Sequence, residues 1–237
     1  GITLAALTPP EDQLDYFDVS DVQEQPLLQG YDLVAFTTFS AMADECYALA
    51  DRYRAAGVAT VIGGLHATLM PQEAKIHVEA VCVGEGEPHW RRIVEDARAG
   101  TLLPFYRQEP SDSYDLAQAP VPRFDLLDVT RYNRLTLQTS RGCPLDCEFC
   151  AASKFLGRYR VKPVANVMAE LDAIKAVWPN PFIELADDNS FVDPRWSKEL
   201  MRELRKRDVR WFSETDVSVA DDPELIDLIA EAGCHQL

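Results

Sequence analysis

In the first hundred residues, short apolar runs alternate with segments in which apolar residues recur at helical spacing, which predicts alternating strands and helices. Short apolar runs occur at Leu33–Phe36, Val61–Ile62 and Ala80–Val83, and each is followed by apolar residues at helical spacing. Gly57 and Gly100 stand where two of these helices would end. Repeated units of this kind predict a parallel sheet whose functional loops follow the strands.

A stretch rich in proline divides the chain. Between residues 104 and 133 the periodicity is lost and four prolines occur. We therefore expect a first domain over 1–103, a connection over 104–133 and a second domain over 134–237. Three further strands, each followed by a helix, are predicted in the second domain at Leu135–Leu137, Phe182–Leu185 and Trp211–Ser213.

Composition narrows the class of protein. The 237 residues are 47% hydrophobic, which is enough for a substantial core. A formal net charge of −16 opposes binding to a phosphate backbone, so nucleic acid is not an expected partner. No apolar run approaches the roughly 20 residues of a membrane-spanning helix, and no signal peptide pattern is present. We expect a cytoplasmic protein without a transmembrane segment.

Three of the six cysteines form a CxxxCxxC array at Cys143, Cys147 and Cys150, directly after a predicted strand. A structural zinc site needs four ligands, and neither a histidine nor a fourth cysteine follows closely. An iron-sulfur cluster takes thiolates, and three of them leave one iron open for a substrate. A zinc site completed by Cys234 or a histidine, and a disulfide with a spare thiol, are the alternatives.

This segment resembles the signature of the radical S-adenosylmethionine (SAM) superfamily. Phe149 provides the aromatic residue before the third cysteine, and Arg141-Gly142 precede the first. The resemblance implies that Cys143, Cys147 and Cys150 hold a 4Fe-4S cluster whose open iron binds SAM. Reductive cleavage of SAM would then give a radical that abstracts an unactivated hydrogen.

The resemblance also implies positions that contact SAM. Besides Phe149, they are residues at the ends of the next two strands, Asp187, Asp188, Ser213 and Glu214. The alternative for the two aspartates is capping of the next helix, and for the other pair an ordinary polar loop.

The ends of the N-terminal strands carry glycine and small polar residues. Glycine there lets a bulky ligand approach the backbone, although His89 stands where a complete dinucleotide fingerprint would need glycine. The order GGLHAT, VCVGEGE and then CxxxCxxC resembles the cobalamin-binding branch of the radical SAM superfamily. That resemblance implies a cobalamin pocket lined by Thr37, Thr38, Ser40, Gly63, Gly64, His66, Gly84 and Gly86. Helix capping by Ser40 and turn geometry for the glycines are the alternatives.

His66 is not expected to be an axial ligand of cobalt. Cobalamin proteins that use such a histidine have the pattern DxHxxG, whereas here Gly64 stands two residues before His66 and Leu69 three after it. We expect His66 to line or support the pocket, with a polar turn histidine as the alternative.

The fold class implied is α/β, a Rossmann-like cobalamin-binding domain followed by a partial (β/α) radical SAM barrel. The resemblance implies an enzyme with a 4Fe-4S cluster, SAM and cobalamin as cofactors. It would transfer a methyl group to an unactivated carbon or phosphorus of a small molecule, with electrons from a donor such as flavodoxin or ferredoxin. Neither the substrate nor a catalytic residue is identified.

Three other functions are considered. A cobalamin-dependent radical cyclase or rearrangement enzyme would share the architecture. A tRNA methylthiotransferase would need three more cysteines in its N-terminal domain, where only Cys46 and Cys82 occur. A non-catalytic cobalamin or metal-binding module would bind cofactor without cleaving SAM.

Both ends differ from a complete member of this branch. The first strand of the cobalamin-binding sheet is expected before Gly1, with Ile2–Leu7 in the first helix, and the later half of the barrel after Leu237. We expect such a fragment to bind the cluster, although it can be inactive in turnover.

Overall fold

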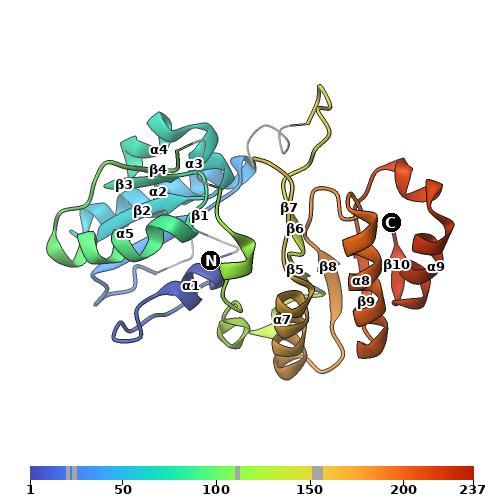
Figure 1. Ribbon diagram of the computed structural model, residues 1–237. Helices are drawn as coiled ribbons and strands as arrows, with labels where there is room; N and C mark the ends of the chain where they lie inside the picture. Colours follow the sequence, from blue (N-terminus) through green and yellow to red (C-terminus); the bar gives the residue numbers. More distant parts are fainter. Residues whose placement is uncertain (20–21, 23–25, 110–112, 151–156) are drawn as a thin grey trace. The chain divides into compact units, whose positions relative to one another are not determined.

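The computed structural model forms two compact units, Gly1–Tyr114 and Asp115–Leu237. Each unit contains a parallel sheet with packed helices, as expected for an α/β protein (Figure 1). The structure describes residues 1–19, 22, 26–109, 113–150 and 157–237.

The first unit contains four parallel strands in the order β1-β2-β3-β4. They are β1 (Leu33–Thr37), β2 (Ala59–Gly63), β3 (Ala80–Val83) and β4 (Phe105–Arg107). The first three include the apolar runs of the sequence. Because neighbouring strands are parallel, they end at one edge of the sheet, where Thr37 pairs with Gly63.

Helices pack on both faces of this sheet (Figure 1). They are α1 (Ile2–Leu7), α2 (Ala43–Ala55), α3 (Leu65–Leu69), α4 (Pro71–His77) and α5 (Glu87–Ala99). α2 contacts α4, and α1 contacts α5 on the opposite face. Gly100 ends α5 in the left-handed conformation, with φ of 69°.

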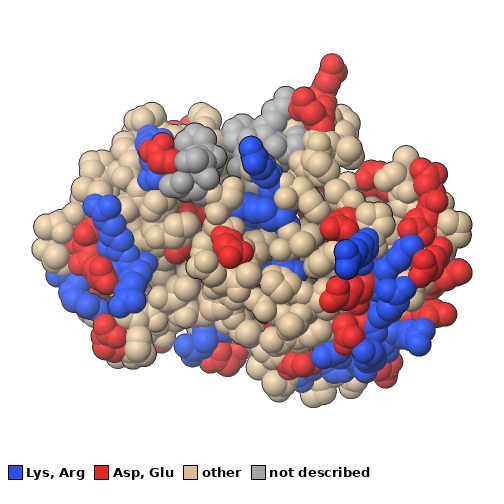
Figure 2. Space-filling model, viewed as in Figure 1, with Lys and Arg blue, Asp and Glu red and all other residues tan. Residues whose placement is uncertain are grey.

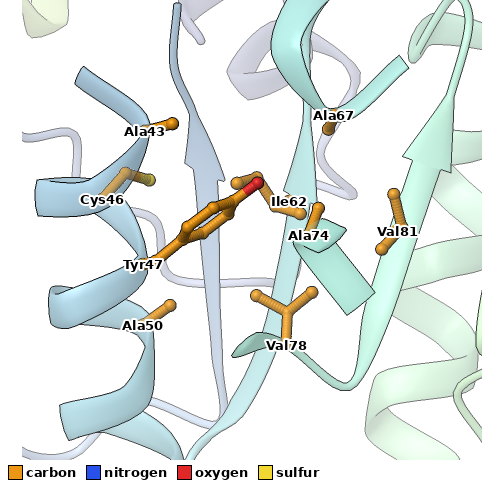
Figure 3. Packing of buried hydrophobic residues seen from close by; sticks show 9 residues of the cluster. All are labelled: Ala43, Cys46, Tyr47, Ala50, Ile62, Ala67, Ala74, Val78 and Val81. Carbon is orange, nitrogen blue, oxygen red and sulfur yellow. The ribbon is translucent and has the colours of Figure 1, made fainter. Parts of the chain in front are cut away.

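Small side chains dominate the core beneath α2, α3 and α4 (Figure 3). Ile62 and Val81 project from the sheet and have no exposed surface. Alanines from the three helices face them, which lets the helix backbones lie close to the strands. Tyr47 is the large side chain among them and carries a buried hydroxyl group.

Strand β4 lies inside the segment that the sequence predicted to be a connection between domains. Its Tyr106 is buried and donates a hydrogen bond of 2.7 Å to Asp96. The carbonyl of Pro104 accepts from the amide of Val81, so a proline fits at this position because only its acceptor is needed. The first unit consequently extends to Tyr114 rather than ending at residue 103.

The second unit contains the parallel strands β5 (Leu135–Leu137), β8 (Phe182–Leu185), β9 (Arg210–Ser213) and β10 (Cys234–Gln236). They lie in the order β5-β8-β9-β10, which is the arrangement of a partial (β/α) barrel. Leu137, Leu185 and Ser213 are level in the register, so three strands end side by side. The loops after these strands therefore share one edge.

Three helices follow strands of this sheet, α7 (Val164–Val177), α8 (Pro194–Leu204) and α9 (Pro223–Glu231). α8 and α9 begin with proline, and the side chains of Asp193 and Asp222 cap their first turns. The helix after β8 is capped by Asp193, not by Asp187 or Asp188, for which capping was the alternative role. Among the described residues, no helix is both long and apolar enough to cross a membrane.

We predict that Ile62→Ala destabilises the first unit strongly. Ile62 is fully buried, so the substitution leaves a cavity and should lower the free energy of unfolding by about 2–5 kcal/mol. The matched control is Ile76→Ala, because Ile76 is 68% exposed and its loss should cost less than about 0.5 kcal/mol. Urea denaturation of both variants measures the difference, and equal midpoints would contradict the described core.

Candidate functional site

The three cysteines of the CxxxCxxC array lie on a loop that leaves the edge of the second sheet and returns to it. We call residues 142–159 the cysteine loop, of which 151–156 lie outside the described residues. Before it, β6 (Ser140–Arg141) pairs antiparallel with β7 (Arg160–Val161) after it. We call these two paired strands the stem.

Glycine is required where the cysteine loop leaves the stem. Gly142 has φ of 79°, which side chains rarely adopt. A Cβ there would lie 2.6 Å from the carbonyl oxygen of Gly157 and 2.9 Å from that of Arg158. The two sides of the loop therefore approach each other through the backbone, directly before Cys143.

A buried ion pair anchors the returning side of the loop. Lys162 lies 2.5 Å from Glu170 of α7, and their side chains are 4% and 3% exposed. The backbone of Lys162 also donates to the carbonyl of Thr139 and accepts from the indole of Trp196. Burial raises the pKa of Glu170, and Lys162 opposes that shift.

The three loop cysteines are free thiols of intermediate exposure. The amide of Cys150 donates to the carbonyl of Cys147, and Phe149 is 92% exposed. Within the described part of the chain, no three His, Cys, Asp or Glu side chains are arranged to bind one metal ion. Three cysteine thiolates on one loop are a donor set that an iron-sulfur cluster takes, whereas a structural zinc site needs a fourth ligand and no histidine or further cysteine follows closely in the sequence.

Asp187 holds the stem to the end of β8. One of its oxygens accepts from the amides of Thr139 and Ser140, at 2.8 and 2.7 Å. The other accepts from the hydroxyls of Thr139 and Ser190. Burial raises the pKa of Asp187, and these hydrogen bonds oppose the shift. The carboxylate that was predicted to contact SAM is engaged within the protein.

A second polar group links the ends of β8 and β9. Asn189 is 3% exposed and lies between Cys143, Thr215 and Asp216. The hydroxyl of Ser190 bonds to that of Ser213. Three of these residues, Asn189, Ser190 and Asp216, were not identified from the sequence as part of the site. The signal that could have indicated Asn189 is its position directly after the two aspartates that follow the strand.

The other predicted SAM contacts differ in accessibility. Asp188 and Glu214 are exposed at the edge where the strands end, as is Phe149. Partial burial raises the pKa of Asp188, and a hydrogen bond from the amide of Gly142 opposes that shift. Ser213 is buried, and its hydroxyl is engaged by Ser190. Asp188, Glu214 and Phe149 are therefore the predicted contacts that a ligand can reach.

In the first unit, the predicted cobalamin residues after β1 and β2 lie at one edge of the sheet. Thr37, Ser40 and Gly64 are exposed there. Gly64 has φ of 92°, and a Cβ on it would lie 2.6 Å from the hydroxyl oxygen of Thr37. Exposed apolar side chains from the same turns, Phe39, Met42, Leu65 and Met70, provide contact area for a large ligand. This edge fits a bulky, partly apolar cofactor.

His66 lies beneath this edge with both ring nitrogens engaged. Its Nδ1 is 3.0 Å from the hydroxyl of Ser40, and its Nε2 is 2.8 Å from that of Tyr47 and 3.3 Å from Glu73. Burial, and then the charge of Glu73, raise the pKa of Tyr47. The Ser40 side chain makes no helix-capping hydrogen bond, and the 3-10 turn Ser40–Met42 begins after Phe39. This geometry agrees with a supporting role for His66.

The loop after β3 is closed by side chains of the same unit. Gly84 donates to the hydroxyl of Thr68, and a Cβ on Gly84 would lie 2.8 Å from the amide oxygen of Gln108. The backbone of Glu85 donates to Gln108, whose amide donates back to the Glu85 carboxylate. Gly86 precedes α5, and space for a Cβ there is ordinary.

We predict that Asp187→Ala destabilises the second unit. The change leaves the buried amides of Thr139 and Ser140 without their acceptor, at about 1–3 kcal/mol for each orphaned donor. The matched control is Asp227→Ala, because Asp227 is an exposed aspartate of α9 in the same unit. Urea denaturation and hydrogen exchange at the two amides measure the effect, and wild-type exchange in the Asp187 variant would contradict the proposed support of the stem.

We predict that alkylation distinguishes the two buried cysteines of the first unit from the three cysteines of the loop. Burial raises the pKa of Cys46 to about 11 and that of Cys82 to about 12, so neither should react with iodoacetamide at pH 8. The three partly exposed loop thiols should react under the same conditions. Peptide mass spectrometry measures the labelling, with guanidinium-unfolded protein as the control in which all thiols react. Equal labelling of Cys46 and Cys147 in the native protein would oppose the prediction.

Two family models match this chain, one in each unit. Residues 16–94 match the B12 binding domain, and residues 137–237 match the radical SAM superfamily. The first family binds cobalamin, and the second uses a 4Fe-4S cluster with SAM. These matches confirm the cofactors predicted from the sequence.

Named proteins of several activities are similar to the chain. Bacteriochlorophyllide d C-8(2)-methyltransferase of Chlorobaculum tepidum is 26% identical over 98% of this chain and 54% of the relative. Anaerobic magnesium-protoporphyrin IX monomethyl ester cyclase of Rubrivivax gelatinosus is 27% identical over 74% of this chain and 37% of the relative. The chain thus spans about half, or less, of the length of these relatives.

A solved structure shares the fold. TsrM of Kitasatospora setae, a radical SAM methyltransferase with cobalamin and a 4Fe-4S cluster bound, superposes with a TM-score of 0.66. It is 18% identical, and the match covers 90% of this chain and 49% of that one. With both family models matched in the predicted order, the chain belongs to the radical SAM superfamily, in the branch that carries an N-terminal B12 binding domain.

Proposed function

We propose that this chain is the cofactor-binding part of a cobalamin-dependent radical SAM methyltransferase. The observation that carries the proposal is the presentation of three free thiols on one stem-closed loop, at the edge where β5, β8 and β9 end. Polar groups suited to a ligand with an amino acid and a ribose lie at the same edge. The similarity to a named methyltransferase over 98% of the chain supports the reaction type.

Specific residues would hold the cluster and SAM. Cys143, Cys147 and Cys150 provide three thiolates, and the exposed Asp188 and Glu214 provide acceptors for an amino group and ribose hydroxyls. When bound, the cluster and SAM supply the one-electron chemistry that activates an unreactive C–H bond, and cobalamin supplies the methyl group. We assign Asp187 and Ser213 to holding the ends of the strands, because their polar atoms are already engaged. Phe149 offers an exposed ring for the adenine.

The edge of the first sheet would hold cobalamin. Exposed hydroxyls of Thr37 and Ser40, together with Thr38, can donate to its polar side chains, and Gly63 and Gly64 bring the backbone to the same edge, where the missing side chain of Gly64 makes room for the Thr37 hydroxyl. His66 would position Ser40 through their 3.0 Å contact rather than bind cobalt. Gly84 and Gly86 complete the edge, although Gln108 already packs against Gly84.

Methyl transfer is favoured over the other reactions. The similarity to a named cyclase covers 74% of the chain, less than the 98% covered by the named methyltransferase. For a methylthiotransferase acting on RNA, a basic surface would be needed. On the face shown in Figure 2, Lys and Arg are mixed with Asp and Glu. Arg202 of α8 pairs with Glu224, and Arg205, directly after α8, pairs with Glu231. We propose a small-molecule substrate and, as electron donor, a flavodoxin or ferredoxin in the cytoplasm.

We predict that Cys147→Ala abolishes the cluster. After anaerobic reconstitution the wild-type protein should be brown, with a broad absorbance near about 400 nm from thiolate-bound iron, and the variant should lack both. Cys82→Ala is the matched control, because Cys82 is buried in the first unit and its loss should leave the iron content unchanged. A persistent chromophore in the Cys147 variant would remove that residue from the ligand set.

The reaction type has its own test. Reconstituted protein with cobalamin, a strong reductant and SAM carrying a trideuterated methyl group is analysed by mass spectrometry. We expect 5′-deoxyadenosine from SAM cleavage and the deuterated methyl group in the corrinoid extracted from the protein. Cleavage without labelled corrinoid would favour a cyclase or rearrangement enzyme, and cobalamin binding with neither product would favour a non-catalytic module.

A further inference from the structure

The side-chain amide of Asn189 contacts three groups at the end of β8. Its Nδ2 lies 2.6 Å from a carboxylate oxygen of Asp216 and 3.9 Å from the sulfur of Cys143. Its Oδ1 accepts from the hydroxyl of Thr215 at 3.1 Å. The residue is 3% exposed, so water cannot readily replace these partners.

These contacts define which way the amide points. Asp216 accepts from the amide of Ser218 at 2.8 Å, and hydrogen bonds from Ser218 are the first cause that lowers the pKa of Asp216, so this carboxylate is ionised at neutral pH and can only accept. The nitrogen of Asn189, rather than its oxygen, must therefore face Asp216. An amide nitrogen carries two hydrogens, and after one is used by Asp216 the other is available to the sulfur of Cys143.

We propose that Asn189 is a positioning residue that donates a hydrogen bond to the Cys143 thiolate and thereby raises the reduction potential of the cluster. This inference rests on the proposed function, because it takes Cys143 as a cluster ligand. Negative charge on the ligand sulfur increases when a cluster gains an electron, so a donor to that sulfur stabilises the reduced form. Hydrogen bonds to the sulfurs are among the factors that set cluster potentials.

The same amide connects the cluster ligand to the loop after β9. Thr215 and Asp216 fix its orientation, and both directly follow Glu214, a proposed contact of SAM. Asp216 is in turn held by the amide of Ser218, at 2.8 Å. The orientation of the amide that donates to Cys143 is therefore maintained by the loop that carries Glu214, a proposed SAM contact.

The test is a redox titration of the reconstituted protein and of Asn189→Ala, followed by electron paramagnetic resonance. Loss of the donor should lower the equilibrium constant for one-electron reduction about tenfold, a potential about 59 mV lower. Thr215→Val, which releases the amide oxygen without changing the charge, should shift the potential in the same direction by less. The matched control is Asn166→Ala, because the half-buried Asn166 of α7 donates its side-chain hydrogen bond to the carbonyl of Ala117 rather than to a cysteine.

Iron content and circular dichroism of each variant separate the outcomes. An unchanged potential in an Asn189 variant with wild-type iron content overturns the inference while leaving the proposed function intact. Loss of iron from a folded Asn189 variant assigns the residue to holding the loop and also overturns it. If Asn189→Ala does not fold, an unchanged potential in Thr215→Val decides against the inference. Failure of the wild-type protein to form a 4Fe-4S cluster would refute the proposed function itself.

Discussion

A buried carboxylate makes the change of direction after β5 possible. At Leu137 the chain leaves a parallel sheet, so the next backbone amides lose the strand partner that would accept their hydrogen bonds. Asp187, two residues beyond the end of β8, accepts from the amides of Thr139 and Ser140. Because Leu137 and Leu185 are level in the register, the carboxylate is placed beside those amides by the sheet itself. The cysteine loop then begins from a fixed stem.

The two units use polar side chains at their strand ends in a comparable way. In the second unit the buried Asp187 accepts hydrogen bonds from the amides at the start of the stem, while its neighbour Asp188 is exposed. In the first unit the buried His66 supports Ser40, which is itself exposed. In each case a buried polar residue is satisfied by the protein and fixes a segment beside an accessible one, which is how a rigid site is built on loops.

The elements and the cysteine array could be predicted from sequence because each has a local signal. Apolar runs marked three strands in each unit, and the spacing of Cys143, Cys147 and Cys150 defined the loop. β4 was missed because it has only three residues, Phe105–Arg107, and follows a proline, which suggests a connection. An edge strand tolerates Pro104 because only its carbonyl takes part in a hydrogen bond. Its place in the sheet depends on pairing with β3, which no local pattern encodes.

The roles of individual polar residues depended on contacts far along the chain. Asp187 meets Thr139 across 48 positions, and Asn189 meets Asp216 across 27. Sequence identified an acidic group after a strand but could not distinguish the aspartate that faces inward from the one that faces outward. That difference follows from the alternation of side chains at the end of β8, which burial makes visible only in the folded chain.

The ion pair between Lys162 and Glu170 constrains how this part of the chain can vary. Both side chains are almost fully buried, so replacing only one of them with an uncharged residue would leave the other as an unpaired charge in the interior. Exchanging both for apolar residues of similar volume avoids that cost. The two positions are therefore expected to vary in concert among related sequences, as a correlated pair at the base of the cysteine loop.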